Sequence, residues 1–269
     1  MLIDTHAHLN FPDFEKDLDE VVNNALKNGV EKIICVSSNL EDSKKAIDIV
    51  RQHPGVVYAA VGIHPQNTNP ENSQSIEEQI KILSELAREK EVVAIGECGL
   101  DFSPAPPGEE ERTKEEQLFL FEKQIELAQK LSLPVIIHSR KVTDKTIEIL
   151  SHYFSTLPSP PSSPPGVWHC YSGSKKGIEI VKNLDFYFGL DGNLTYDEGL
   201  QNIVRHIPLE RILLETDSPF LTPIPYRGLR NTPVNVKIIA EFLAQLQGVS
   251  FEKVCQITSE NAKKFYNKI

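Results

Sequence analysis

The sequence predicts a TIM (β/α)8 barrel built as one domain that spans residues 1–269. Short apolar runs rich in Val and Ile recur along the chain. Several are apolar on both faces, as strands buried on both sides of a parallel sheet must be. Stretches with helical spacing of apolar residues separate these runs. A length of 269 residues is also common for a single α/β barrel.

Eight runs are expected to form strands, and a helical or connecting stretch follows each of them. Eight such units fit a closed barrel better than an open doubly wound sheet. The predicted strands cover residues 2–9, 32–38, 56–64, 92–99, 134–139, 166–170, 186–192 and 211–217.

Amphipathic helices are expected between the strands. In residues 17–27 and 116–131, apolar side chains three and four positions apart define one buried face. Residues 234–246 show a similar pattern, and a short helix over residues 251–266 follows them.

Two Pro-rich segments interrupt this alternation, at residues 103–108 and 157–166. Neither can continue a helix. The second could be an interdomain linker, but it lies between a helix and a strand that the barrel requires. Both are therefore expected to be exposed loops.

Composition indicates a folded, water-soluble protein, with 40% hydrophobic and 25% charged residues. No run approaches the roughly 18 apolar residues that a membrane span needs. No signal peptide is expected, because Asp4 and His6 precede any apolar segment, so the expected location is the cytoplasm. The four cysteines form no CxxC pair and are expected to be reduced and mostly buried. The net charge of −10 argues against a broad basic groove for duplex nucleic acid.

Residues that commonly bind metals stand at the ends of five predicted strands. The first strand carries an HxH pair, and alternate residues of a strand share a face. The carboxyl ends of all barrel strands meet at one mouth, so these side chains should converge. Any one of these residues could have a purely structural role, as a core histidine or as a carboxylate that caps neighbouring amides. It is improbable that all of them stand at the same end of the barrel for such unrelated reasons. They are His6, His8, Glu97, His138, His169 and Asp217.

Four imidazoles and two carboxylates provide enough donors for two divalent ions, with one carboxylate bridging them. Two such ions would polarise a bound water and stabilise charge on a phosphoryl or carbonyl oxygen. Asp217 could accept the proton of that water. The imidazole-rich set suits Zn, Mn, Co or Ni better than Mg on ligand preference alone.

Further polar residues are expected near the same mouth. His64 ends the third strand and is expected to bind substrate or to support a ligand. Arg140, Arg227 and Asn231 lie on loops leaving the mouth, and arginine pairs bidentately with phosphate. For Arg227 and Asn231, a role in loop structure is a serious alternative. Asp101 is expected to support a ligand histidine or pair with an arginine, and Asp4 to support the site from one layer deeper.

Six sequence blocks resemble, in order and spacing, those of TatD-type metal-dependent deoxyribonucleases, a family of the amidohydrolase superfamily. The resemblance spans nearly the whole chain, although the two Pro-rich segments look longer or richer in proline than is usual in the family. The blocks are DTHAHL, GIHP, AIGECGLD, LPVIIHSR, HCYSGS and LLETDSPFLTPIPYRGLRN.

The resemblance implies that His6, His8 and Asp217 hold one metal, that His138 and His169 hold the second, and that Glu97 bridges the two. Glu97 and Asp217 are then the expected catalytic residues, and the cofactors are two divalent ions (Zn, Mn or Mg). The implied activity is hydrolysis of DNA phosphodiesters, as an exonuclease from a 3′ end linked to DNA repair.

Two other functions stay open at this point. One is an amidohydrolase-type esterase or deacylase, such as an aminoacyl-tRNA deacylase, although Glu97 stands where such enzymes often place a carbamylated lysine. The other is a non-catalytic binding protein, but no ligand position is lost. The net negative charge of the chain favours a single-stranded DNA end over a duplex as substrate partner. No membrane or obligate protein partner is evident, and a monomer is expected.

Overall fold

The computed structural model describes residues 1–67, 75–104, 112–155 and 165–269. Its eight strands are parallel and hydrogen-bonded in sequence order, which confirms the predicted barrel. The strands are β1 (Leu2–Ala7), β2 (Val30–Val36), β3 (Val57–Val61), β4 (Val92–Asp101), β5 (Val135–Arg140), β6 (Gly166–Trp168), β7 (Tyr187–Leu190) and β8 (Ile212–Leu214).

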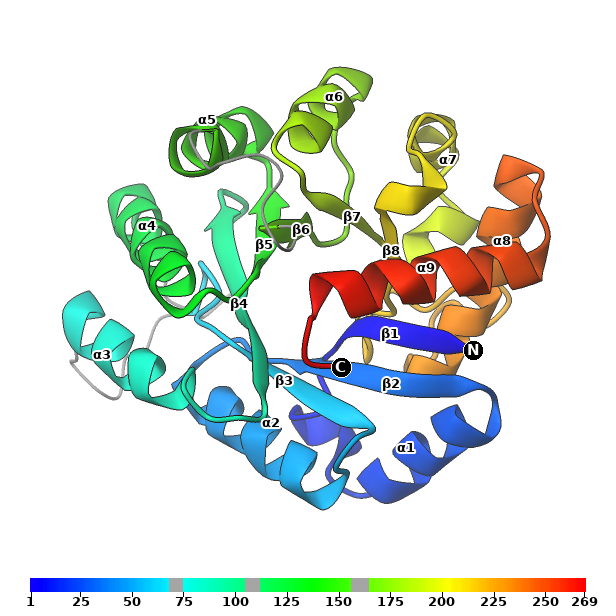
Figure 1. Ribbon diagram of the computed structural model, residues 1–269, viewed down its shortest axis with the longest axis horizontal. Coiled ribbons are helices and arrows are strands. Elements are labelled where there is room, and N and C mark those ends of the chain that lie inside the picture. The colour runs from blue at the N-terminus through cyan, green and yellow to red at the C-terminus, as the bar shows by residue number, and fades with distance from the viewer. Residues whose placement is uncertain (68–74, 105–111, 156–164) are drawn as a thin grey trace.

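Helices follow the strands and surround them (Figure 1). The four helices predicted by spacing all form, with ends within two residues of those expected. The Pro-rich segments 103–108 and 157–166 lie largely outside the described residues. The helices are α1 (Leu18–Lys27), α2 (Leu40–Gln52), α3 (Ile76–Leu86), α4 (Lys114–Leu131), α5 (Thr143–Phe154), α6 (Lys175–Asn183), α7 (Glu198–Val204), α8 (Val236–Gln247) and α9 (Phe251–Phe265).

Six of the strands end two or three residues earlier than predicted, and two of these ends shape the mouth of the barrel. β6 stops at Trp168 and β8 at Leu214, before the predicted ends at residues 170 and 217. Cys170 and Asp217 have φ angles of 47° and 54°, a left-handed conformation that no strand can continue. The chain therefore turns out of the sheet close to His169 and at Asp217.

The first strand and the chain that follows the last strand close the barrel. Ala7 forms an isolated parallel bridge with Ser218, and the Asp217 amide donates to the His6 carbonyl at 2.9 Å. Below this bridge, the Asp4 carboxylate accepts hydrogen bonds from the Thr216 amide at 2.9 Å and its hydroxyl at 2.6 Å. These contacts place the HxH pair beside Asp217.

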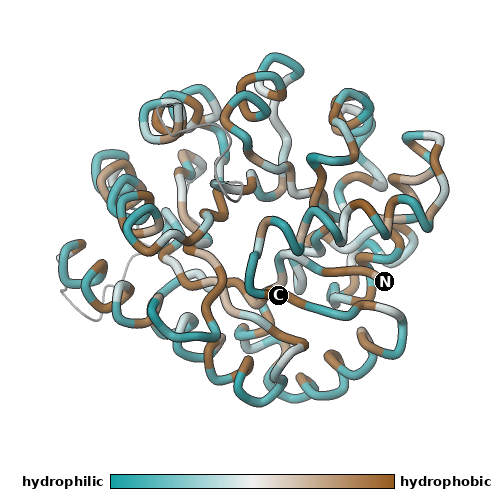
Figure 2. The backbone as a smooth tube through the Cα atoms, viewed as in Figure 1, coloured by the Kyte–Doolittle hydropathy of each residue, from teal (hydrophilic) through white to brown (hydrophobic). Residues whose placement is uncertain are grey.

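Apolar side chains fill both the barrel interior and the layer between strands and helices. Figure 2 shows hydrophobic residues along the strands and on parts of the surrounding helices. The end of α9 seals one end of the barrel, where Phe265 and Tyr266 join the interior cluster. The Tyr266 hydroxyl donates to the Thr5 carbonyl at 3.1 Å. Figure 1 views this end, with α9 lying across it. The carboxyl ends of the strands form the opposite, open end.

None of the described helices combines the length and the apolar character needed to cross a membrane. The four cysteines are unpaired.

Candidate metal centre

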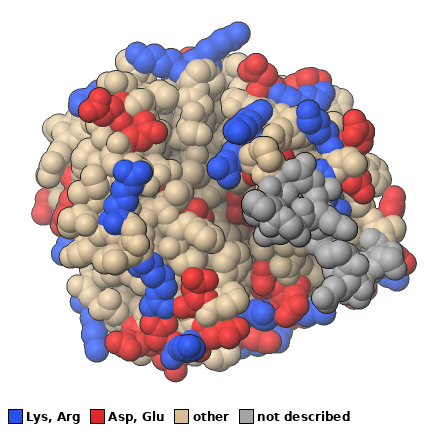
Figure 3. Space-filling model, turned by 180° about the vertical axis from the view of Figure 1, so that it is seen from behind, with Lys and Arg blue, Asp and Glu red and all other residues tan. Residues whose placement is uncertain are grey.

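The six predicted donor residues meet at the open end of the barrel. Five of them line a cavity of about 610 Å³, and His6 lies beneath it with no exposed surface. Figure 3 shows this face of the molecule, which is hollowed near its centre and carries Lys and Arg side chains around the hollow. Residues from five strand ends thus share one pocket.

Two imidazole nitrogens and two carboxylate oxygens lie close together around His6 and His8. The Nε2 atoms of His6 and His8 lie 3.2 Å apart. Glu97 Oε2 lies 3.5 and 3.8 Å from these two nitrogens, and Asp217 Oδ1 lies 3.7 and 3.3 Å from them. Four ligands about 2.1 Å from a central ion stand about 3.4 Å from one another. His6, His8 and Glu97 thus form a group that could hold one cation, and Asp217 Oδ1 lies close to both imidazoles of that group.

The second oxygen of Glu97 faces a different set of imidazoles. Glu97 Oε1 lies 2.7 Å from His138 Nδ1 and 3.8 Å from His169 Nε2. His64 Nε2 lies 3.9 Å from the same oxygen. One carboxylate thus faces two groups of nitrogens, as a ligand shared by two cations does.

The two carboxylates of the site favour their negatively charged forms, which suits the binding of a cation. Burial by itself would raise the pKa of Glu97, but the charge of His169 and hydrogen bonds from His138 and His6 hold that pKa well below its usual value. Burial likewise opposes ionisation of Asp217, but the hydrogen bond from His8 and the charges of His169, His8 and His6 together outweigh it and lower the pKa. Both carboxylates therefore favour the ionised form, and the raised pKa values of His8, His138 and His169 show that the carboxylates attract positive charge to the site.

Glycines on β4 allow Glu97 and His138 to approach each other. A Cβ atom on Gly99, whose φ is 148°, would clash with the His138 carbonyl oxygen. A Cβ atom on Gly96 would meet the side chain of Ile136 at 2.6 Å. Side chains at these two positions would push β4 away from β5 and separate the two donors.

Carboxylates outside the donor set hold two of the histidines. Asp101 Oδ2 lies 3.2 Å from His138 Nε2, in the supporting position that the sequence predicts. Glu215 Oε1 lies 2.9 Å from His169 Nδ1 and accepts from the Cys170 amide at 2.7 Å. Sequence reasoning missed Glu215, although a second acidic residue two positions before Asp217 was a signal for it.

The structure brings two of the remaining predicted residues to the cavity. His64 and Arg140 both line its wall. Burial and the charge of His138 lower the pKa of His64 to about 3, so its imidazole is neutral. The His64 Nδ1 atom accepts from the Gln66 amide at 3.2 Å, which directs Nε2 toward Glu97.

Arg227 and Asn231 contact their own loop or its neighbours, in agreement with the structural role that the sequence left as an alternative. Arg227 is not among the described residues that line the cavity, and its guanidinium lies 4.0 Å above the centre of the Tyr196 ring. Asn231 is fully buried. Its amide donates to the carbonyls of Thr216 and Phe220 at 2.9 and 2.7 Å. The Asn231 side chain therefore holds the loop after β8 in place.

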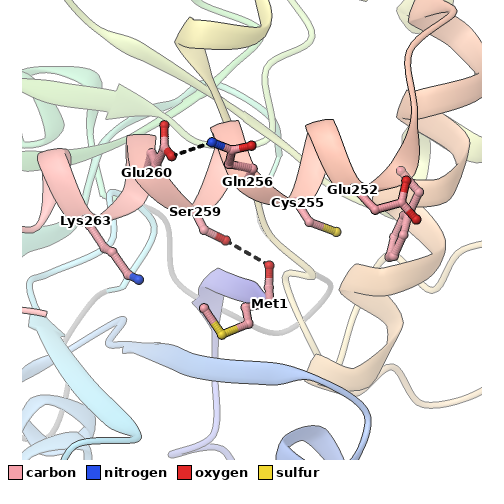
Figure 4. Close-up of a pocket in the computed structure, with 8 residues that line it drawn as sticks. Met1, Glu252, Cys255, Gln256, Ser259, Glu260 and Lys263 are labelled. Atoms are coloured by element: carbon pink, nitrogen blue, oxygen red, sulfur yellow. Dashed lines mark hydrogen bonds between the residues drawn. The ribbon is translucent and has the colours of Figure 1, made fainter.

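A second pocket, of about 340 Å³, lies at the opposite end of the barrel between Met1 and α9 (Figure 4). There the Ser259 hydroxyl donates to the Met1 carbonyl at 3.1 Å, and Gln256 donates to Glu260 at 3.0 Å. Its walls contain no cluster of metal-binding donors among the described residues. The site of interest is therefore the cavity at the carboxyl ends of the strands.

Comparison with known proteins gives matches along almost the whole chain. The family model described as TatD related DNase matches residues 3–267. An uncharacterized metal-dependent hydrolase of Bacillus subtilis, YabD, is 36% identical over 268 residues, which cover 99% of each chain. The human deoxyribonuclease TATDN3 is 34% identical over 272 residues, which cover 100% of this chain and 95% of that protein. The crystal structure of YJJV, a TatD homolog from Escherichia coli, superimposes with a TM-score of 0.86 at 30% identity, covering 99% of this chain and 98% of that one.

Proposed function

Because the chain belongs to the TatD-related DNase family, we propose that it cleaves phosphodiester bonds of DNA with two divalent cations held at the mouth of the barrel. Membership makes it a metal-dependent hydrolase that acts on ester bonds. One observation carries the two-cation proposal. The two oxygens of Glu97 face separate groups of imidazoles, so this carboxylate is placed to bridge two ions.

We assign His6, His8 and Asp217 to the first ion and His138 and His169 to the second, with Glu97 between them. The distances of 3.2–3.8 Å that separate the two imidazole nitrogens from each other and from the carboxylate oxygens support the assignment of the first ion. When bound, two cations supply a polarised water and compensate the negative charge that develops on the phosphoryl oxygens. Zn, Mn and Mg are the candidate metals, and the imidazole-rich donor set favours the first two.

The residues of the chain supply the proton transfer and the substrate contacts. Asp217 is ionised and opens to the cavity, so its carboxylate is placed to accept the proton of the attacking water. Arg140 stands at the rim and can pair with a phosphate of the strand. His64 is neutral, so it can hydrogen-bond a substrate oxygen without adding charge.

The size of the cavity favours the end of a single strand as substrate. A volume of about 610 Å³ lies within the range of pockets that hold small ligands and is too small for a duplex. Cleavage from the 3′ end rests on the family resemblance. No lysine occurs among the described residues that line the cavity, which disfavours the acyl-hydrolase alternative built on a carbamylated lysine.

The proposal is tested with single-stranded DNA labelled at either end and incubated with Mg²⁺, Mn²⁺ or Zn²⁺. We compare wild type with Glu97→Gln, which keeps the side-chain shape but removes the bridging charge. Activity should fall on the order of 100-fold or more, because even weaker perturbations of a metal site cost 10–100-fold. Glu241→Gln, an exposed residue of α8, is the matched control. Equal cleavage by wild type and Glu97→Gln would contradict the proposal.

A further inference from the structure

The loop that follows β8 exposes an unusual concentration of large apolar side chains. Seven such side chains are exposed among the described residues, and four of them lie between residues 220 and 229. Clustered exposed apolar groups beside a functional cavity commonly mark a contact with a ligand or partner. The four are Phe220 at 50% exposure, Ile224 at 49%, Tyr226 at 49% and Leu229 at 65%.

Only Phe220 of these four is among the described residues that line the cavity, and Phe11 lines it as well. The two rings have centroids 6.1 Å apart and are inclined by 74°. Phe11 stacks on the ring of His8, with centroids 4.5 Å apart and planes 18° from parallel. One imidazole therefore separates the proposed first cation from the aromatic pair.

The backbone of Phe220 is fixed, although its ring is half exposed. Its amide donates to the Asp217 carbonyl at 2.8 Å, and its carbonyl accepts from the Asn231 amide at 2.7 Å. Asn231 itself is fully buried. The loop thus holds the Phe220 ring at the edge of the cavity, at a set position relative to Asp217.

We propose that Phe220, supported by Phe11, is a stacking platform for the nucleobase of an unpaired nucleotide whose phosphodiester lies at the metal centre. This inference rests on the proposed DNA hydrolysis and names a recognition element for it. A phenyl ring has no hydrogen-bonding group, so it would accept any base by its flat face. The platform would also favour single strands, because the faces of a base within a duplex are covered by neighbouring base pairs.

The position of the pair explains why a base is the expected occupant. The remaining cavity wall is dominated by histidines, carboxylates, hydroxyls and Arg140, which suit a phosphate and its ions. The aromatic pair occupies the His8 side of that wall. A nucleotide has the same division, with a charged phosphate at one end and a flat apolar base at the other.

The test compares two single-stranded oligonucleotides that differ only in their last two nucleotides, which carry bases in one and are abasic in the other. On the base-bearing strand, Phe220→Ala should lower kcat/KM by roughly 5- to 150-fold, the range expected for loss of one stacked base. On the abasic strand its effect should be less than about twofold, because no stacking remains to be lost. Phe220→Trp should keep the activity on the base-bearing strand.

Leu229→Ala is the matched control, because Leu229 is an exposed apolar residue of the same loop outside the cavity lining. It should leave kcat/KM unchanged on both strands. Equal losses for Phe220→Ala on the two strands would overturn the platform, as would equal losses for Phe220→Ala and Leu229→Ala. The latter result would indicate a role of the whole loop, for example as a protein contact. If wild type leaves both strands intact, the proposed DNA hydrolysis itself fails.

A binding measurement gives an independent readout. An oligonucleotide with 2-aminopurine near its 3′ end and hydrolysis-resistant phosphorothioate linkages should lose fluorescence when wild type binds it, because stacking quenches this base. Phe220→Ala should bind with little quenching. Quenching that persists in Phe220→Ala would place the base elsewhere and overturn the inference.

Discussion

Glu215 Oε1 lies 2.9 Å from His169 Nδ1, so a buried carboxylate sets the orientation of this histidine and directs its Nε2 atom toward Glu97 and Asp217. Room for Glu215 comes from Gly189 on the neighbouring strand, where any Cβ atom would clash with the Glu215 carboxylate. Carboxylate–histidine pairs of this kind fix the tautomer of a metal-binding imidazole and raise its basicity.

Glu215→Gln should therefore weaken the binding of a divalent ion by about 10–100-fold. The Gln side chain fills the same space, so the fold should be preserved. Isothermal titration with Zn²⁺ or Mn²⁺ measures the affinity, and Glu210→Gln, which changes an exposed residue nearby, serves as control. An unchanged metal affinity would contradict a role of Glu215 in metal binding.

Metal binding should strengthen as the pH rises from about 6.5 to about 9. In the metal-free protein, burial opposes the charge on His138, but the hydrogen bonds to Asp101 and Glu97 and the negative charges of these two carboxylates together outweigh it and raise the pKa of His138 to about 9. A cation must displace this proton, so its affinity is lowest where the proton is fully bound. Titrations with Mn²⁺ at several pH values measure the trend. Asp101→Asn removes one partner of the imidazolium and should shift the trend to lower pH.

The same raised pKa makes a prediction for stability without metal. Because the folded pKa of His138 exceeds its ordinary value of 6.5, protonation stabilises the fold fully below about pH 6.5. That contribution is lost as the pH rises through about 9. Denaturant unfolding of protein treated with a chelator should give a lower free energy of unfolding at pH 9 than at pH 6. The difference between the two pH values should be smaller in Asp101→Asn. An equal loss in both proteins would assign the effect to other groups.

Gly99→Ala should destabilise the protein by about 3 kcal/mol, as overpacking against rigid backbone does. The new methyl group would clash with the His138 carbonyl, and φ at this position is 148°. Thermal unfolding measures the change. Gly199→Ala is the control, because a Cβ there meets only the Asp197 carboxylate at 3.1 Å and alanine favours the helix α7. A Gly99→Ala protein as stable as wild type would show that β4 can move away from β5 at little cost.

Arg140 and Arg227 form a matched pair of exposed arginines near the mouth, and only Arg140 lines the cavity. Arg140→Ala should raise KM for single-stranded DNA by roughly 10-fold and reduce its dependence on salt, because one phosphate contact is lost. Arg227→Ala should have a much smaller effect, since its guanidinium stacks on Tyr196. Steady-state kinetics at two salt concentrations distinguishes them. A larger effect for Arg227 would show that the substrate reaches beyond the described cavity.

The positions of most site residues could be predicted from the fact that they stand at the ends of predicted strands. The barrel brings the ends of all strands to one mouth, so recognising His6, His8 and His138 as strand-terminal residues was enough to place them together. The roles of Arg227 and Asn231 could not be decided in this way, because a loop residue near a mouth can face either the cavity or its own loop. Their partners, Tyr196 for one and the Thr216 and Phe220 carbonyls for the other, became known only from the folded loop.

The sequence by itself determined the barrel and predicted the six candidate donors, because hydrophobic periodicity and residue type are local properties of the chain. Only the tertiary structure decided that the two oxygens of Glu97 face different imidazoles, that Glu215 holds His169, and that Phe220 stands at the cavity edge. The contacts of Glu97 and Glu215 depend on distances of 2.7–3.5 Å between side chains from different parts of the chain. The close approach of β4 to β5 at Gly99, and the left-handed turn at Asp217, set those distances.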